Sequence, residues 1–376
     1  MPLLGWQFET LTAGVVAVAV AMTLLLWPRV HGPRMLKGAQ RVAMVLGCQV
    51  AAVLLVGLAV NNYGYFYGSW SDLLGTSSAQ PVGAASEGPQ GQFGRTIVVP
   101  AVTFDRATTW LPLSAAAVRG KVESLRIHGA RSGLTSDALI YLPPQYFQPA
   151  YAHHQFPAVE VLTGYPGVTN SLVTRLHVPE LYLAELQHRR AQPMILVMLR
   201  PTVAPPRDTE CTDVPAGPQT LTYLTQDVPS ALDGLLRVRP LDWGAMGEST
   251  GGYCAVKAAM LHSDIFRAAV SLSGYYHTLE DPTTGNLWGG SQVLRNLNSP
   301  EWLLAHQPAP PVSVLASIGQ QEGGLGGFSD LRRFMSLIRP PMTGSSIIVS
   351  GAGHNYANWS RVLPTAFDWL SAKLHA

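Results

Sequence analysis

Residues 243–256, WGAMGESTGGYCAV, place a serine between glycines directly after an apolar run. Gly247, Ser249 and Gly251 fit the pattern G-x-S-x-G, which has catalytic meaning when a strand precedes it and a helix follows. Such a turn raises the serine hydroxyl above the sheet edge and directs the Thr250 N–H at a developing oxyanion. We therefore predict that Ser249 is a nucleophile; the alternative is a Gly/Ser helix start without chemistry.

A serine hydroxyl needs a base, and after this kind of turn the partners follow in the order serine, acid, histidine. His354 lies in the glycine-rich loop GAGH, between an apolar run and the final helical stretch. We predict that His354 is the base; the alternative is a surface loop histidine. The other histidines after the serine fit different roles: a helix C-terminus (His262), the pocket lining (His277), a solvated loop (His306) and the chain terminus (His375).

The acid of such a site should follow a strand that lies between the serine and the histidine. Glu322 directly follows the apolar run VSVLASI and is our predicted acid, which would hold the imidazole tautomer and stabilise the imidazolium. Asp330 starts a helix, where an N-cap role explains it, and Asp281 comes too early. The second oxyanion donor is predicted in the loop TGYPG at the Tyr165 N–H; the alternative is a turn without a binding role.

Strand-like and helix-like segments alternate from residue 121 onward, which predicts an α/β fold: a mostly parallel sheet flanked by helices. Charged residues make up 13% of the chain, against about 25% in soluble proteins, and the net charge of +2 gives no basis for binding nucleic acid. The predicted strands begin near residues 122, 138, 157, 194, 243, 266, 311 and 345, and the predicted helices span 222–238, 251–262, 329–338 and 359–374.

The N-terminal part is predicted to be a membrane anchor with two transmembrane helices, at about 11–27 and 42–60. Four basic residues lie between the two uncharged runs, and none lies close outside them, so the positive-inside rule places the short loop in the cytoplasm. Both termini and the catalytic domain would then be extracytoplasmic, on a multi-pass protein of the plasma membrane. The alternative is a signal peptide followed by a buried helix.

The sequence predicts three parts: an anchor (1–62), an extracytoplasmic linker and lead-in (63–120) and a catalytic domain (121–376). Residues 77–94 are rich in Gly, Ser, Ala, Pro and Gln and are predicted to be a flexible linker. Residues 95–120 are ambiguous between a linker and a segment packed on the domain edge.

Three cysteines are too few for a disulfide scaffold, and their spacing suggests no metal site. Cys211 follows one predicted strand and Cys254 follows the serine by just over one helical turn, so a disulfide between them would brace the turn. The alternative is two unpaired small core residues. Cys48 falls in a membrane span and should be free. The neighbouring acids Asp208, Glu210 and Asp213 are interpreted as solvated loop charges; the alternative is contact with a cationic or polyhydroxyl substrate.

Taken together, GESTGG, IGQQEGG, GAGHNYANW and LTGYPG resemble the Putative esterase family of α/β hydrolases, which includes esterase D-like enzymes, feruloyl esterases and actinobacterial mycolyltransferases. The resemblance covers roughly residues 121–376, and the anchor suggests a membrane-anchored actinobacterial type. It implies an α/β-hydrolase fold, a Ser–acid–His triad and acyl-ester chemistry without a metal or organic cofactor. Trp359, shortly after the predicted base, also matches the mycolyltransferases, whereas GYPGVTNSL lacks the charged residues of their acceptor loop.

Two functions from different classes follow. The first is a membrane-anchored serine esterase or acyltransferase that acts on carboxylic esters, including lipid or glycolipid esters of the cell envelope, with no nucleic acid and no identified protein partner. The second is a non-catalytic envelope protein that keeps the fold for binding or assembly. The filled triad positions favour the first.

Overall fold

The computed structural model describes residues 3–76, 81–84, 116–324 and 326–374. The chain divides into two compact units. The hairpin unit comprises residues 1–78 and 351–355, and the sheet unit comprises residues 79–350 and 356–376. Each unit is considered by itself.

The hairpin unit contains two long helices, α1 (Trp6–Leu26) and α2 (Arg34–Gly64), with a short 3-10 turn η1 (Trp27–Arg29) after the first and a one-turn helix α3 (Trp70–Leu73) after the second. Asn62 ties the open ends of the two helices together, because its side chain accepts from the Gly5 N–H (3.1 Å) and donates to Glu9 (2.8 Å). Both helices are long and apolar enough to cross a membrane, a property that a signal sequence shares.

The strands of the sheet unit form one nine-stranded sheet among the described residues, in the order β1-β9-β8-β7-β6-β4-β5-β3-β2. The six strands from β9 to β5 in this order are parallel to their neighbours, and β1, β3 and β2 pair antiparallel. The strands are β1 (Pro81–Ala84), β2 (Lys121–His128), β3 (Thr135–Leu142), β4 (Phe156–Leu162), β5 (Ile195–Leu199), β6 (Val238–Glu248), β7 (Phe266–Leu272), β8 (Ser313–Gly319) and β9 (Thr343–Val349).

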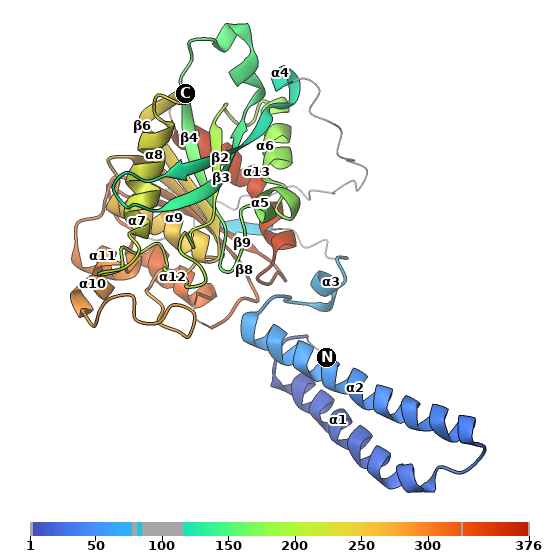
Figure 1. The fold of residues 1–376 in the computed structure, drawn as a ribbon. Coiled ribbons are helices and arrows are strands. Elements are labelled where there is room, and N and C mark those ends of the chain that lie inside the picture. The colour runs from blue at the N-terminus through green and yellow to red at the C-terminus, as the bar shows by residue number, and fades with distance from the viewer. Residues whose placement is uncertain (1–2, 77–80, 85–115, 325, 375–376) are drawn as a thin grey trace. The chain divides into compact units, whose positions relative to one another are not determined.

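Helices cover both faces of the sheet, as Figure 1 shows. Successive residues of β6 point to opposite faces of the sheet, so Gly244 and Ala245 pack against different layers of helices. A Cβ on Gly244 would lie 3.1 Å from Leu374 at the C-terminal end, whereas Ala245 belongs to the core that contains Tyr253 and Ala255. The helices are α4 (Ala116–Arg119), η2 (Pro144–Phe147), η3 (Pro149–Tyr151), α5 (Asn170–Thr174), α6 (Val178–Gln187), α7 (Thr220–Thr222), η4 (Tyr223–Asp227), α8 (Val228–Leu232), α9 (Thr250–Leu261), α10 (Gln292–Leu297), α11 (Pro300–His306), α12 (Phe328–Leu337) and α13 (Tyr356–Lys373).

The predicted α/β architecture is therefore correct, but several segments differ. The strand predicted to begin near residue 243 begins at Val238. The helix predicted over 222–238 ends at Leu232, because Asp233 is extended and Gly234 has a left-handed φ of 80°. Its middle, η4, has π-helical bonding. The prediction of a flexible linker over 77–94 is wrong for residues 81–84, which form strand β1. Strand pairing uses backbone groups and needs no apolar pattern, so composition could not reveal it. The rest of 77–94, and residues 95–115, lie outside the described residues.

Candidate active site

Ser249 lies on a strained turn between β6 and α9. Its φ of 55° and ψ of −123° fall in a region that residues with side chains rarely occupy. Its N–H donates to Leu272 O (2.9 Å), and its carbonyl accepts from the N–H groups of Gly252 (2.9 Å) and Tyr253 (3.2 Å). Such a conformation costs about 1–3 kcal/mol and persists only where the surroundings hold it, which is typical of a functional position.

The two glycines around the serine are required by close backbone contacts. A Cβ on Gly247 would lie 2.3 Å from the Gly251 carbonyl carbon, and a Cβ on Gly251 would lie 2.3 Å from Leu162 O. The obstructing atoms belong to the backbone, so no rotation of a side chain can relieve them. The sequence argument for glycine at both positions therefore has a direct steric basis.

The loop after β4 passes directly beside the serine. A Cβ on Gly164 would lie 2.9 Å from the Ser249 Cβ and 2.4 Å from a carboxylate oxygen of Glu248. A turn closed by the Gly167 N–H on Gly164 O (2.8 Å) follows, and the Tyr165 hydroxyl donates to Pro206 O (2.9 Å). The structure thus brings the loop that carries Tyr165 to the N-terminus of α9, where Thr250 is the first helical residue.

Glu322 lies just beyond β8 and is 5% exposed. Its Oε1 accepts from the Ser273 hydroxyl (2.7 Å) and from the Gly319 N–H (2.7 Å). The Trp359 indole N–H in turn donates to the Ser273 oxygen (2.9 Å). This chain of hydrogen bonds orients the carboxylate. Sequence reasoning did not identify Ser273, although its place directly after β7 was a usable signal.

Asp330 does not cap a helix as expected. Gly327 is the residue before α12, and the Asp330 carboxylate accepts from the Tyr276 N–H (3.2 Å) and pairs with His277 Nδ1 (3.1 Å). The hydrogen bond to Asp330 is the main cause that raises the pKa of His277. This second histidine–acid pair links the segment after β7 to α12.

The sequence assigns roles to two other histidines. His262 lies at the end of α9 as predicted, and burial lowers its pKa. His306 is not in a loop but ends helix α11, where its ring stacks on Trp302 with the ring centroids 4.4 Å apart.

His354 belongs to residues 351–355 of the hairpin unit. Its N–H donates to Tyr65 O (2.7 Å), and the preceding Gly353 N–H donates to the Asp72 carboxylate (3.2 Å). Its placement against Ser249 and Glu322 stays a prediction from the sequence.

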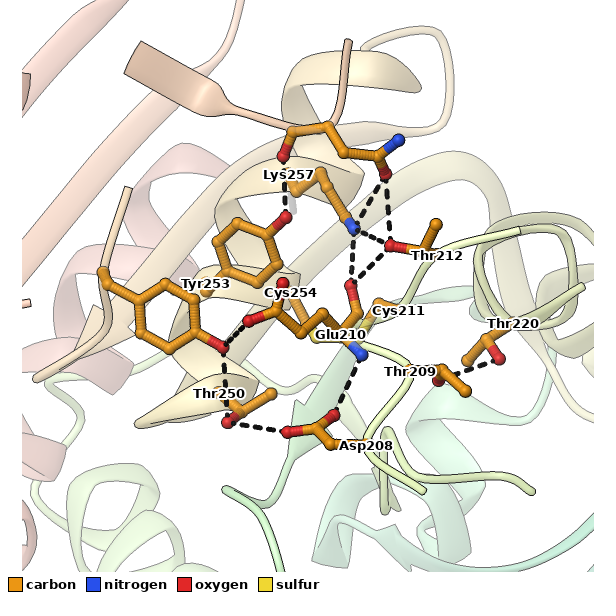
Figure 2. The surroundings of a disulfide bond; sticks show 12 residues. Asp208, Thr209, Glu210, Cys211, Thr212, Thr220, Thr250, Tyr253, Cys254 and Lys257 are labelled. Carbon is orange, nitrogen blue, oxygen red and sulfur yellow. Dashed lines mark hydrogen bonds between the residues drawn. A yellow bond between two sulfur atoms is a disulfide. The ribbon is translucent and has the colours of Figure 1, made fainter. Parts of the chain in front are cut away.

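The structure joins Cys211 and Cys254 in a disulfide, and Cys48 is free. Asp208 and Glu210 lie beside the disulfide in the sequence. Their interpretation as solvated charges is wrong, because Asp208 is only 4% exposed and Glu210 only 1% exposed. The loop that carries them folds against α9, next to the fully buried Lys257, as Figure 2 shows. A contact between segments far apart in the chain leaves no local pattern, so the sequence could not indicate this burial.

The arrangement suits acyl transfer through a serine. Ser249, Ser273 and Glu322 follow three neighbouring parallel strands, β6, β7 and β8, whose carboxyl ends share one edge of the sheet. Ligand and reaction sites of open α/β sheets lie at this edge. Within the described part of the chain, no group of three or more His, Cys, Asp or Glu side chains could hold a metal ion.

Comparison with known proteins agrees with this geometry. The family model described as Putative esterase matches residues 133–370. An S-formylglutathione hydrolase from Agrobacterium tumefaciens has a similar structure, with a TM-score of 0.58 and 13% identity, over 69% of this chain and 97% of that one. A ferulic acid esterase gives a TM-score of 0.56 and 16% identity, over 69% and 100% of the two chains.

A third structure, the fluorophosphonate-binding serine hydrolase F of Staphylococcus aureus, gives a TM-score of 0.54 and 17% identity, over 67% and 98%. None of the curated proteins matches the chain. The family match covers more than half of the residues of the chain, and the strained turn at Ser249 lies within the matched range. The chain is a carboxylic ester hydrolase with the α/β-hydrolase fold and belongs to the Putative esterase family.

Proposed function

We propose that the protein is a membrane-anchored, extracytoplasmic serine esterase in which Ser249, His354 and Glu322 form the triad. The observation that carries the proposal is the strained backbone of Ser249 between two sterically required glycines. His354 accepts the proton of the Ser249 hydroxyl as it attacks the ester carbonyl. Glu322, itself oriented by Ser273, holds the imidazole in the productive tautomer.

The negative charge of the tetrahedral intermediate is stabilised by the N–H groups of Thr250 and Tyr165. Thr250 begins helix α9, where backbone N–H groups and the helix dipole favour negative charge. Tyr165 follows Gly164, whose backbone lies against Ser249. The alcohol leaves with the proton from His354, and a water or an acceptor alcohol resolves the acyl-enzyme by the reverse route.

The substrate proposal rests on the N-terminal helices. With α1 and α2 in the plasma membrane and the basic loop between them in the cytoplasm, the catalytic unit works just outside the bilayer. Lipid or glycolipid esters of the envelope are then the substrates at highest local concentration. Hydrolysis and acyl transfer share the acyl-enzyme, so transfer to an envelope alcohol is a second outcome of the same chemistry.

The test is labelling with a membrane-impermeant fluorophosphonate, a reagent class that one structural relative is named for binding. Intact cells with wild-type protein should label, and cells with Ser249→Ala should not. Ser336→Ala is the matched control, because Ser336 is an exposed residue of α12 whose hydroxyl donates to Arg333 O in its own helix (2.7 Å).

Each result has a distinct meaning. Labelling of Ser249→Ala equal to wild type would remove Ser249 from the role of nucleophile. Labelling that appears only after lysis would retain the esterase and reverse the proposed topology. Absence of labelling in folded wild-type protein would overturn the triad.

A further inference from the structure

The loop 206–213, between β5 and α7, contacts both residues of the proposed oxyanion hole. Pro206 O accepts from the Tyr165 hydroxyl (2.9 Å), and the Asp208 Oδ2 lies 3.5 Å from the Thr250 hydroxyl. Three segments far apart in the chain therefore meet here: the loop after β4, the start of α9 and the loop 206–213.

A disulfide and the hydrogen bonds of a buried lysine hold this loop on helix α9, as Figure 2 shows. Cys211 is disulfide-bonded to Cys254, and one turn further along the helix Lys257 donates to the Glu210 carbonyl and to the Thr212 hydroxyl (3.1 Å). Lys257 is fully buried, and its third contact, Asn298 Oδ1 (3.1 Å), also accepts a hydrogen bond. Burial lowers the pKa of Lys257 to about 7, and the buried nitrogen is hydrogen-bonded to three neutral oxygens, two of them in the loop.

Buried acids continue the network towards the serine. The Glu210 carboxylate accepts from the Tyr275 hydroxyl (2.7 Å) and the Leu279 N–H (3.3 Å), and the same tyrosine oxygen lies 3.5 Å from the Thr250 hydroxyl. Burial raises the pKa of Glu210 to about 7 and also raises the pKa of Asp208. Burying the Glu210 and Asp208 carboxyl groups costs free energy, and neither residue belongs to the proposed triad.

Asp208 joins the loop to the helix with its two oxygens. Its Oδ1 accepts from the Glu210 N–H (2.9 Å), which fixes the loop where Glu210 and Cys211 have left-handed φ values of 45° and 51°. Its Oδ2 faces Thr250, the residue directly after the nucleophile. The Asp208 carboxylate therefore contacts both the loop backbone and the side chain of the first residue of α9.

We propose that the loop 206–213 is a positioning element of the oxyanion hole, with Asp208 as the positioning residue for Thr250 and the Cys211–Cys254 disulfide as its lock. The proposal rests on the proposed function, because it assigns the loop to the transition state of that reaction. Positioning acts on the transition state more than on bound substrate, so its loss should lower kcat and leave KM nearly unchanged.

The experiment compares Asp208→Ala and Asp208→Asn with wild type, as full chains in detergent, on a soluble p-nitrophenyl ester. Rates are divided by the amount of serine that a fluorophosphonate labels at the end point, so misfolded protein does not count. Asp213→Ala is the control in the same loop, because Asp213 accepts from the N–H (2.9 Å) and hydroxyl (2.7 Å) of Thr222 rather than from Thr250.

We expect Asp208→Ala to lower kcat per labelled serine roughly 10- to 100-fold, with KM within about twofold. Asp208→Asn should restore most of the rate, because an amide still accepts from the Glu210 N–H and bonds to the Thr250 hydroxyl. Equal kcat in Asp208→Ala and Asp213→Ala, with wild type active, would overturn the positioning role alone. Wild type that neither labels nor hydrolyses any ester would overturn the proposed function and this inference with it.

A second measurement keeps the proposal falsifiable if Asp208→Ala does not fold. The double variant Cys211→Ser/Cys254→Ser frees the loop without touching either proposed oxyanion donor. It should show the same fall in kcat per labelled serine at nearly constant KM. A normal kcat in this variant would show that the disulfide does not position the hole.

Discussion

At the residue scale, the site depends on a serine, Ser273, that lies outside the sequence motifs. Glu322, at the proposed acid position, is held by Ser273, which in turn accepts from Trp359. All three are nearly buried, with exposures of 5%, 4% and 6%. The sequence predicts Glu322 from its place after a strand. Ser273 stands directly after β7 and offers the same signal, but its hydrogen bond to Glu322 has no pattern along the chain.

Replacing Ser273 tests whether this support matters. Ser273→Ala removes the hydroxyl that donates to Glu322 Oε1 and leaves the Gly319 N–H, and we expect kcat to fall about 3- to 30-fold because the carboxylate loses its fixed orientation. Steady-state kinetics on a soluble ester measure the effect. Ser345→Ala, at a serine of β9 that is 3% exposed, makes the same change in the same sheet and should stay near wild type. Equal rates in the two variants would contradict the role of Ser273.

A second residue, Glu160, is fully buried in β4, and neither carboxyl oxygen has a hydrogen-bond partner within the described structure. Burial raises its pKa well above 4.5, so the folded state keeps a proton that the unfolded state releases. The free energy of unfolding therefore falls as the pH rises from the unfolded pKa towards the folded one.

We expect Glu160→Met to be more stable than wild type at pH 8, by about 1–3 kcal/mol, with a smaller gain at pH 5. Thermal unfolding at the two pH values measures this difference. Glu185→Met should instead lose stability, because Glu185 is paired with Arg190. A gain for Glu160→Met that does not depend on pH would show that Glu160 is not protonated on folding.

At the scale of elements, the turn from β6 to α9 could be predicted and the loop before it could not. The turn has a local requirement, two glycines and a serine at fixed spacing, and the structure supplies the steric reason in the contacts of Gly247 and Gly251. The loop 206–213 and strand β1 depend on partners far away in the chain, so their composition suggested solvated charges and a linker.

Gly251 gives a direct test of this turn. Gly251→Ala places a Cβ 2.3 Å from Leu162 O and 2.6 Å from Thr163 O, so β4 and α9 must separate. We expect a loss of at least 1–3 kcal/mol of stability, roughly the cost of overpacking, and a loss of esterase activity in the folded fraction. Gly217→Ala is the control, because its nearest neighbour would be the Val214 side chain, 3.0 Å away, rather than backbone. Wild-type activity in Gly251→Ala would contradict the required close approach.

At the scale of the whole molecule, the proposed anchor should determine which esters the enzyme meets. Full-length protein in vesicles can be offered an ester lipid in the same vesicle or in separate vesicles. We expect turnover in the same vesicle to be roughly 100-fold faster, because attachment raises the effective concentration. A soluble ester in both preparations is the control. Equal rates on both lipid presentations would remove the anchor from the choice of substrate.

Strand β1 fixes the length of chain between the proposed anchor and the sheet. Helix α2 ends at Gly64 and β1 begins at Pro81 on the edge of β9, so residues 65–80 connect them. Fully extended, a segment of that length reaches about 50–60 Å, and its α3 turn shortens this further. If α2 spans the bilayer as proposed, this length is an upper limit on the distance between the membrane and strand β1. Esters in more distant layers of an envelope would have to come to the enzyme.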